Sequence, residues 1–218
     1  MQTEITREFI EQVADAIARD DREFILGEMG GMYPADITTV LYELDTNQTK
    51  YLLEILDANI GAEILTDLDS DVRTDFLSNY SSAEVARFID QMDSDDAVDI
   101  LNEQSVKVRE EVIAHLTDQK LASNIVDLLH YDEDCAGGLM AKEFIKVNIN
   151  WRVRQCIEEV RRQAEQVEKI YSMYVVNDQD ILMGRLSTKS LLLATDNTLI
   201  AEIYEPEVIS IESYKDEA

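Results

Sequence analysis

The sequence predicts a two-part fold: an α-solenoid of short helical hairpins, followed by a small domain whose elements run in the order β-α-β-β-α. Three observations predict this. Apolar residues recur at a constant interval in the first part of the chain, which is typical of stacked helical units. Short apolar runs separated by turn residues follow in the second part. The net charge also changes, from −23 over residues 1–134 to −4 over residues 135–218.

The repeat is visible as columns of apolar side chains, each kept through four copies at a fixed step, from position 40 to positions 64, 88 and 112. One column consists of Val40, Ile64, Phe88 and Val112, and another of Leu53, Leu77, Leu101 and Ile125. Within a copy, apolar residues follow the i, i+3, i+4, i+7 spacing of an amphipathic helix, and a turn leads to a second such stripe. Because one helical hairpin cannot bury its own apolar face, we expect the hairpins to stack.

Polar residues at the expected helix ends support this interpretation. Ser81 followed by Glu84 predicts a capping box, and Ser70 and Ser94 are candidate N-caps. The segment before Tyr33 predicts one longer amphipathic helix and a shorter one, which would close the end of the stack.

The pattern changes after His130, and the pair Gly137–Gly138 indicates a loop. The expected strands are residues Phe144–Val147, Tyr171–Val176, Ile181–Leu186 and a further one at Val208–Ile211. The expected helices are one with an apolar face through Val153, Cys156, Ile157 and Val160, and one from Ser187 to Leu193. Residues 177–180 predict a tight turn between the middle strands.

The charge excludes several classes of partner. The chain has 19 Lys and Arg against 46 Asp and Glu, a net charge of −27. Such a polyanion repels nucleic acids and anionic lipid headgroups, so we expect neither as a partner. It attracts cations or a basic protein. The N-terminus lacks the pattern of a signal peptide, and no run approaches the length of about 20 apolar residues that a membrane span needs.

No catalytic motif is present, so we do not expect an enzyme. The sequence contains no phosphate-binding loop and no nucleophile elbow. Cys135 and Cys156 are far apart and His115 and His130 are isolated, which gives no zinc signature. Two such thiols fit a reducing compartment.

Asp95 and Asp99 are the most informative acidic pair. Their i, i+4 spacing places both carboxylates on one helical face, and Mg²⁺ prefers oxygen ligands while keeping several waters. A plainer interpretation remains for Asp95, because acids in a first helical turn stabilise the helix dipole without any metal. It explains Asp99 less well.

The residues YDEDCAGGLM, followed by IYSMYVVNDQDILMGRLSTKSLL, resemble the junction and first CBS domain of the MgtE family of magnesium transporters. The acidic repeats resemble that family's N domain. The resemblance implies three segments: residues 1–134 as the N domain, 135–206 as the first CBS domain, and 207–218 as the start of a truncated second CBS domain. It also implies a transmembrane pore absent from this chain, a location at the cytoplasmic face of the membrane, and a homodimer formed through CBS domains.

The same resemblance implies a set of metal ligands and a mechanism. In this family an acidic pair, with a Glu one repeat earlier, faces the CBS domain and binds Mg²⁺, which corresponds here to Glu63, Asp95 and Asp99. A backbone carbonyl of the Gly pair takes part, here Gly138. Mg²⁺ between the N domain and the CBS unit would bring the two together and hold the pore shut. From its position early in a helix, Glu63 could equally be a solvated surface residue.

Two features depart from nucleotide-binding CBS domains. Ser190 stands where such domains place an acidic residue for the ribose, and Ser172 where some relatives place an aromatic ring. We therefore leave ATP out of the expected ligands. The alternatives to a Mg²⁺ sensor are an acidic scaffold for a basic protein partner and a nucleotide-responsive CBS regulator.

Overall fold

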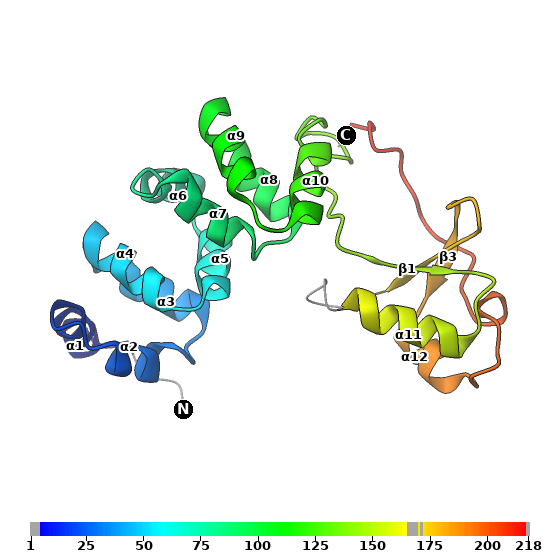
Figure 1. Cartoon of the computed structure of the whole chain (residues 1–218), viewed down its shortest axis with the longest axis horizontal. Helices are drawn as coiled ribbons and strands as arrows, with labels where there is room; N and C mark the ends of the chain where they lie inside the picture. Colours follow the sequence, from blue (N-terminus) through cyan, green and yellow to red (C-terminus); the bar gives the residue numbers. More distant parts are fainter. Residues whose placement is uncertain (1–4, 165–169, 171, 217–218) are drawn as a thin grey trace. The chain divides into compact units, whose positions relative to one another are not determined.

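The computed structural model describes residues 5–164, 170 and 172–216, and the chain divides into two compact units (Figure 1). One unit comprises Met1–His130 and the other Tyr131–Ala218. The first is helical, and the second contains the sheet. The predicted limits at residues 134 and 206 remain predictions.

The helical unit is a succession of short helices that follow one another in chain order (Figure 1). The first two are α1 (Arg7–Ala18) and α2 (Arg22–Met29). Four hairpins follow: α3 (Pro34–Leu41) with α4 (Thr46–Ile55), α5 (Ala58–Asp67) with α6 (Ser70–Leu77), α7 (Ser82–Ile89) with α8 (Ser94–Asn102), and α9 (Val106–His115) with α10 (Gln119–Leu128). The first helices of successive hairpins pack side by side, α3 on α5, α5 on α7 and α7 on α9.

The repeat predicted from the sequence is confirmed. The first helices of the four hairpins begin at Pro34, Ala58, Ser82 and Val106, which is the same interval as in the apolar columns. All members of the two columns are buried: Val40, Ile64, Phe88 and Val112, and Leu53, Leu77, Leu101 and Ile125. The columns therefore form the contacts through which neighbouring hairpins stack.

Helix capping was predicted correctly at one place and wrongly at two. Ser81 and Glu84 form a capping box at the start of α7, as expected. Ser70 and Ser94 are not N-caps, because α6 and α8 begin at these residues and Asp69 and Asp93 precede them as N-caps. Both types of residue suit an N-cap, and here the extended backbone is at the aspartate.

The second unit has the predicted order β-α-β-β-α. Its elements are β1 (Ile145–Asn148), α11 (Val153–Ala164), β2 (Met173–Val176), β3 (Leu182–Leu186) and α12 (Thr188–Leu193), followed by a short 3₁₀ helix η1 (Ile200–Glu202). The strands form one sheet in the order β1-β2-β3. β1 and β2 are parallel and joined through α11, whereas β2 and β3 form an antiparallel hairpin. Of the predicted second strand, Tyr171 lies outside the described residues.

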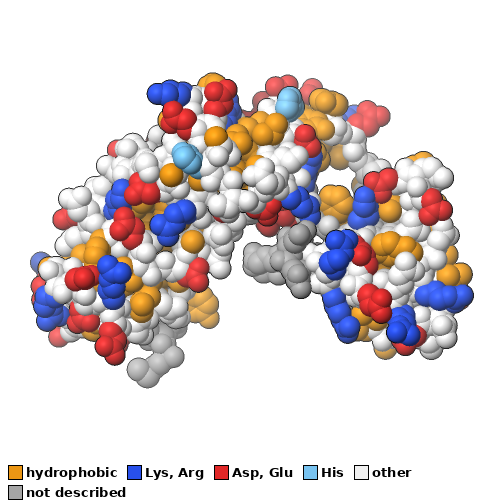
Figure 2. All heavy atoms as spheres, in the orientation of Figure 1, with side chains coloured by type: hydrophobic (Ala, Val, Ile, Leu, Met, Phe, Trp, Pro, Cys, Tyr) orange, Lys and Arg blue, Asp and Glu red, His pale blue; other side chains and the backbone are white. Residues whose placement is uncertain are grey.

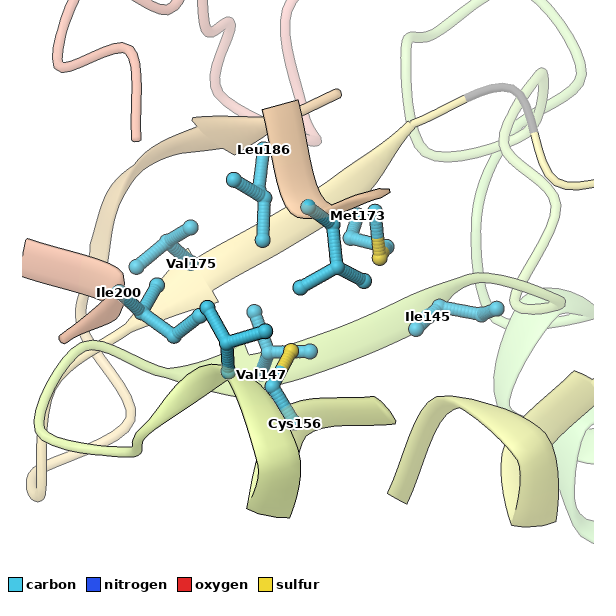
Figure 3. Close-up of a cluster of buried hydrophobic side chains, with 9 residues drawn as sticks. Ile145, Val147, Cys156, Met173, Val175, Leu186 and Ile200 are labelled. Atoms are coloured by element: carbon cyan, nitrogen blue, oxygen red, sulfur yellow. The ribbon is translucent and has the colours of Figure 1, made fainter. Parts of the chain in front are cut away.

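The core of this unit lies on one face of the sheet (Figure 3). Strand side chains that alternate toward that face meet apolar residues of the helices. The fully or nearly fully buried members are Ile145, Val147, Val153, Cys156, Met173, Val175, Leu186, Leu191 and Ile200. Cys156 acts as a small apolar core residue, and burial raises the pKa of its thiol to about 11.

The strand predicted at Val208–Ile211 is wrong. These residues form no strand, and the side chains of Ile209 and Ile211 are exposed. An extended segment needs a neighbouring strand to receive its backbone groups. Among the described residues near the C-terminus, strand-like pairing consists of isolated bridges, Arg185 with Glu205 and Cys135 with Asp216.

Candidate cation site

Helix α8 carries the densest group of predicted ligands. Asp95 and Asp96 lie in its first turn, and Asp99 lies one turn later. The N-cap Asp93 adds a further carboxylate and makes no side-chain capping hydrogen bond. Because residues at i and i+4 share a helical face, Asp95 and Asp99 are neighbours on α8.

Burial makes this acidic group unusual. Asp95 and Asp96 are both partly buried, and Oδ1 of Asp95 is buried without a hydrogen-bond partner among the described residues. Burial raises the pKa of Asp96 to about 6, and the negative charges of Asp95, Asp93 and Asp99 add to the effect. An unpaired buried carboxylate oxygen is costly. The carboxylates in the first turn of α8 therefore repel one another, and a bound cation would reduce this repulsion.

Glu63, the third predicted carboxylate, lies on α5 and is exposed to solvent. Its helix packs against α3, α4 and α7. Its exposure fits either a ligand that reaches a partly hydrated cation or a solvated surface residue, so its assignment remains a prediction.

Arg73 on α6 links the helices that carry these residues. Its Nη1 donates to the carbonyl oxygen of Leu65 in α5 at 2.8 Å, and its Nε donates to Glu103, the C-cap of α8, at 2.9 Å. Sequence reasoning missed this residue. A signal was present, because the equivalent positions of the other repeats hold Thr49, Ala97 and Leu121, which are all buried and uncharged.

Gly138, the predicted carbonyl ligand, lies in the second unit, in a tight turn that begins at Asp132. Its amide donates to the carbonyl oxygen of Cys135 at 2.9 Å. A Cβ at this position would lie 2.4 Å from the carbonyl oxygen of Asp132. The turn is further held by the C-terminal segment, since the amide of Gly137 donates to the carbonyl oxygen of Ser213 at 2.6 Å. Only glycine therefore fits at Gly138.

The described residues do not form a complete metal centre. Among them, no three His, Cys, Asp or Glu side chains lie together in a way that could hold a metal ion. Mg²⁺ does not require such a cage, because it often binds through one or two carboxylates and retains waters. The carboxylates of α8 are oxygen donors of the type that a partly hydrated Mg²⁺ takes.

The second unit also has an open cavity of about 710 Å³, lined in part by Phe144, Tyr174 and Leu182. Tyr174 alternates with the buried residues of β2, so it lies on the sheet face opposite the core. The rings of Phe144 and Tyr174 meet edge to face, with centroids 5.7 Å apart. This sheet face is exposed and mixed in character, because Lys146 and Arg185 lie on either side of Tyr174 in the neighbouring strands.

Ser190 does not point to a nucleotide site. Its hydroxyl lies 2.8 Å from Oγ of Ser187, and its amide donates to the same atom at 3.1 Å. Ser190 therefore belongs to the N-cap of α12. A hydroxyl engaged in this way is a poor substitute for a ribose-binding carboxylate.

Acidic side chains are otherwise spread over the surface of the helical unit, as the face in Figure 2 shows. Several of them cap helices: Asp45 accepts from the amide of Gln48, and Asp118 from the amides of Lys120 and Leu121. Within the part of the chain that the structure describes, no helix is both long and apolar enough to cross a membrane.

Comparison with known proteins shows what the helical unit is similar to. Residues 32–134 match the family model described as the MgtE intracellular N domain. The magnesium transporter MgtE of Thermus thermophilus is 27% identical over 207 residues, which is 93% of this chain and 46% of that protein. The chain spans less than half the length of the curated relatives it matches.

Solved structures of related proteins have the same fold over nearly the whole chain. The soluble part of a magnesium transporter superposes with a TM-score of 0.82 and is 26% identical, covering 96% of this chain and 82% of that one. The cytosolic domain of the Mg²⁺ channel MgtE, in complex with ATP, gives a TM-score of 0.83 at 26% identity and covers 94% and 82%. The resemblance to the MgtE family and the predicted fold class are thus confirmed.

Proposed function

We propose that this chain is the Mg²⁺-sensing regulatory region of a magnesium transporter, acting at the cytoplasmic face of the membrane on a pore elsewhere in the protein. The match of residues 32–134 to the MgtE N domain and the similarity to cytosolic parts of magnesium transporters support this. The curated relatives are named as transporters, which supports a role other than catalysis.

The observation that carries the proposal is the buried, unpartnered Oδ1 of Asp95 within the acidic first turn of α8. In this proposal Asp95 and Asp99 bind Mg²⁺ directly or through its waters, Glu63 contributes from α5, and the carbonyl of Gly138 contributes from the second unit. Since ligands divided between two units are complete only when the units meet, Mg²⁺ favours the closed arrangement. Closure then inhibits the pore.

The affinity expected from such a site is modest. Few ligands bind directly, and part of the coordination shell is water. A ligand shifts a conformational equilibrium only by the difference between its affinities for the two states. A sensor of this kind therefore responds at Mg²⁺ concentrations near its modest dissociation constant.

The proposal includes a homodimer formed through the second unit. The exposed side chains of Phe144, Tyr174 and Leu182 support it, since aromatic side chains are enriched at interfaces. Sedimentation of the chain and of Tyr174→Ser tests this part. A chain that sediments as a monomer over the full concentration range contradicts it.

ATP is not part of the proposal, although one similar structure contains it. The hydroxyl of Ser190 is occupied within the N-cap of α12. A rise in the melting temperature with ATP in the absence of divalent cations would instead favour the nucleotide-responsive regulator.

The experiment is a titration of Mg²⁺ against K⁺ at matched ionic strength, followed by small-angle scattering and thermal unfolding. We expect compaction and a rise in melting temperature with Mg²⁺ that K⁺ does not produce. Asp99→Asn should weaken both responses. Asp75→Asn is the matched control, because it removes one exposed carboxylate at the same position of α6 that Asp99 holds in α8.

Identical responses to the two salts would contradict a specific Mg²⁺ site and indicate general screening of the negative charge. The acidic scaffold for a basic partner would then be the better interpretation. Equal losses in Asp99→Asn and in the control variant would also contradict the assignment to α8.

A further inference from the structure

The contacts of Arg73 extend across three helices of the unit. From α6, its guanidinium reaches the carbonyl oxygens of Leu65 and Thr66 in the last turn of α5, at 2.8 and 3.3 Å. On the other side it forms a two-pronged ion pair with Glu103, the C-cap of α8. Such forked pairs are among the strongest and most directional hydrogen-bonded contacts in proteins.

The pair is mostly shielded from water. The side chains of Arg73 and Glu103 are 11% and 17% exposed. Removing one partner of a shielded pair leaves an uncompensated charge, whereas removing both leaves the net charge unchanged. The two single changes and the double change therefore separate charge from packing.

The positive charge of Arg73 also interacts with the carboxylates of α8. The hydrogen bond to Glu103 is the largest contribution that raises the pKa of Arg73, and the charges of Asp99 and Asp96 contribute as well. Glu103, which holds the guanidinium, follows Asp99 by four residues at the end of α8, so the positive charge of Arg73 lies near the carboxylates of this helix. It competes with any cation that approaches them, while Glu103 offsets it.

We propose that the Arg73–Glu103 pair fixes α5 relative to α8 and sets the electrostatic potential at the acidic face of α8, so that it tunes the affinity for a divalent cation there. The inference rests on the proposed function, because it concerns the same candidate site. Arg73 and Glu103 are positioning residues and do not bind the cation themselves.

Three variants test the inference, with Mg²⁺ binding followed by thermal shift and calorimetry at constant ionic strength. Arg73→Gln removes a competing positive charge and should tighten Mg²⁺ binding by about threefold or more. Glu103→Gln leaves the positive charge of Arg73 unopposed and should weaken binding by a similar factor. The double variant Arg73→Gln/Glu103→Gln should return close to the wild-type affinity.

The opposite signs distinguish tuning from a merely structural role. If the pair only held the helices together, both single changes would weaken Mg²⁺ binding and the double variant would not recover. That result overturns the inference. Arg73→Lys retains the charge but loses the fork, so it should not tighten binding, and tightening in this variant would exclude charge as the cause.

The outcomes also separate the inference from the proposed function. If the wild-type chain shows no Mg²⁺-specific response, both the proposed function and the inference are contradicted. A wild-type chain that responds to Mg²⁺, with single variants that shift in the same direction or not at all, overturns only the tuning by Arg73 and Glu103. If Arg73→Gln fails to fold, the other two single variants decide. We then expect Glu103→Gln to bind Mg²⁺ more weakly and Arg73→Lys not to bind it more tightly. Any other pair of results overturns the inference.

Discussion

The acidic side chains of the helical unit and of the second unit, here called the sheet unit, have different kinds of hydrogen-bond partner. In the sheet unit, acidic side chains lie beside basic ones on the surface, as in the pairs Lys146–Asp180 at 2.7 Å and Arg185–Glu205 at 2.8 Å. In the helical unit, many acids serve helix ends: Asp90, for example, accepts hydrogen bonds from Thr117 and Asp118 at the start of α10. Capping requires an acceptor and no counter-charge.

The difference explains part of the negative charge of the helical unit. A fold of many short helices has many N-termini, and acids there are favourable. The acids of α8 go beyond this requirement, since the charges of Asp95, Asp93 and Asp99 all raise the pKa of a partly buried Asp96. Local conflict of this kind is expected at functional sites.

The largest effect we predict tests whether the two units are also independent in stability. Gly184→Ala should destabilise the sheet unit by about 2–3 kcal/mol, because the added Cβ would lie 2.1 Å from the carbonyl oxygen of Glu205. Chemical denaturation followed by the fluorescence of Trp151, which packs against the sheet core, reports this unit. The helical circular dichroism signal largely reports unfolding of the helical unit.

Gly27→Ala is the matched control in the helical unit. Gly27 is an exposed residue within α2, and nothing lies within 4 Å of the position of an added Cβ. This change should stabilise the helical unit by about 0.5–1 kcal/mol. A single transition that shifts equally in both probes for Gly184→Ala would show that the two units unfold together.

The second prediction concerns the repulsion among the carboxylates of α8. Asp96→Asn should stabilise the helical unit by about 1 kcal/mol at pH 7 without divalent cations, a value reduced for the solvent that still reaches the group. The folded pKa of Asp96 is about 6, above the unfolded value of about 3.9. The wild type therefore gains stability from this group as the pH falls from about 6 to 4, and the difference between wild type and variant should disappear near pH 4.

Asp180→Asn in the sheet unit provides the contrast for Asp96. Asp180 is exposed and paired with Lys146, and its positive φ of 62° suits asparagine. We expect no stabilisation and a loss of at most about 1 kcal/mol. Stabilisation of equal size in both variants would mean that net charge alone, and not the position on α8, decides the effect. Urea unfolding at several pH values measures both.

The sequence predicted the repeated elements far better than the single contacts. The constant interval between apolar columns predicted the hairpins because each column has to be buried in every copy, as Val40 and Val112 are. The N-caps of α6 and α8 were misplaced by one position, because Asp69–Ser70 and Asp93–Ser94 offer two suitable residues in succession. The strand at Val208–Ile211 failed because alternation of apolar residues does not supply a neighbouring strand.

The candidate site shows the same limit. The i, i+4 spacing of Asp95 and Asp99 could be read from the sequence, and the helix that it requires is present. The sequence could not predict the burial of Asp95 Oδ1 or the pairing of Arg73 with Glu103, because both depend on how the hairpins stack. Arg73 is the charged residue in a column that is otherwise uncharged, a signal that the sequence analysis did not use and that does not identify its partner.

The smallest effect we predict comes from an acid of the helical unit that behaves like those of the sheet unit. Glu84 lies 2.8 Å from Nζ of Lys50 and also accepts a hydrogen bond from the amide of Ser81 at 2.7 Å. The hydrogen bond from Lys50 is the largest of the contributions that lower the pKa of Glu84 to about 2. Since the unfolded value is about 4.3, this carboxylate stabilises the folded state above that pH and loses its contribution as the pH falls toward 2.

Glu84→Gln keeps an acceptor for the capping box but removes the charge, so we expect a loss of about 0.5 kcal/mol at pH 7, as for other exposed ion pairs. The loss should persist down to about pH 4 and vanish near pH 2, which is the reverse of the sign for Asp96→Asn. Urea unfolding of the two variants side by side measures both differences. A stabilising Glu84→Gln would show that the total negative charge of the helical unit outweighs its local pairing, and the distinction drawn for α8 would then fail.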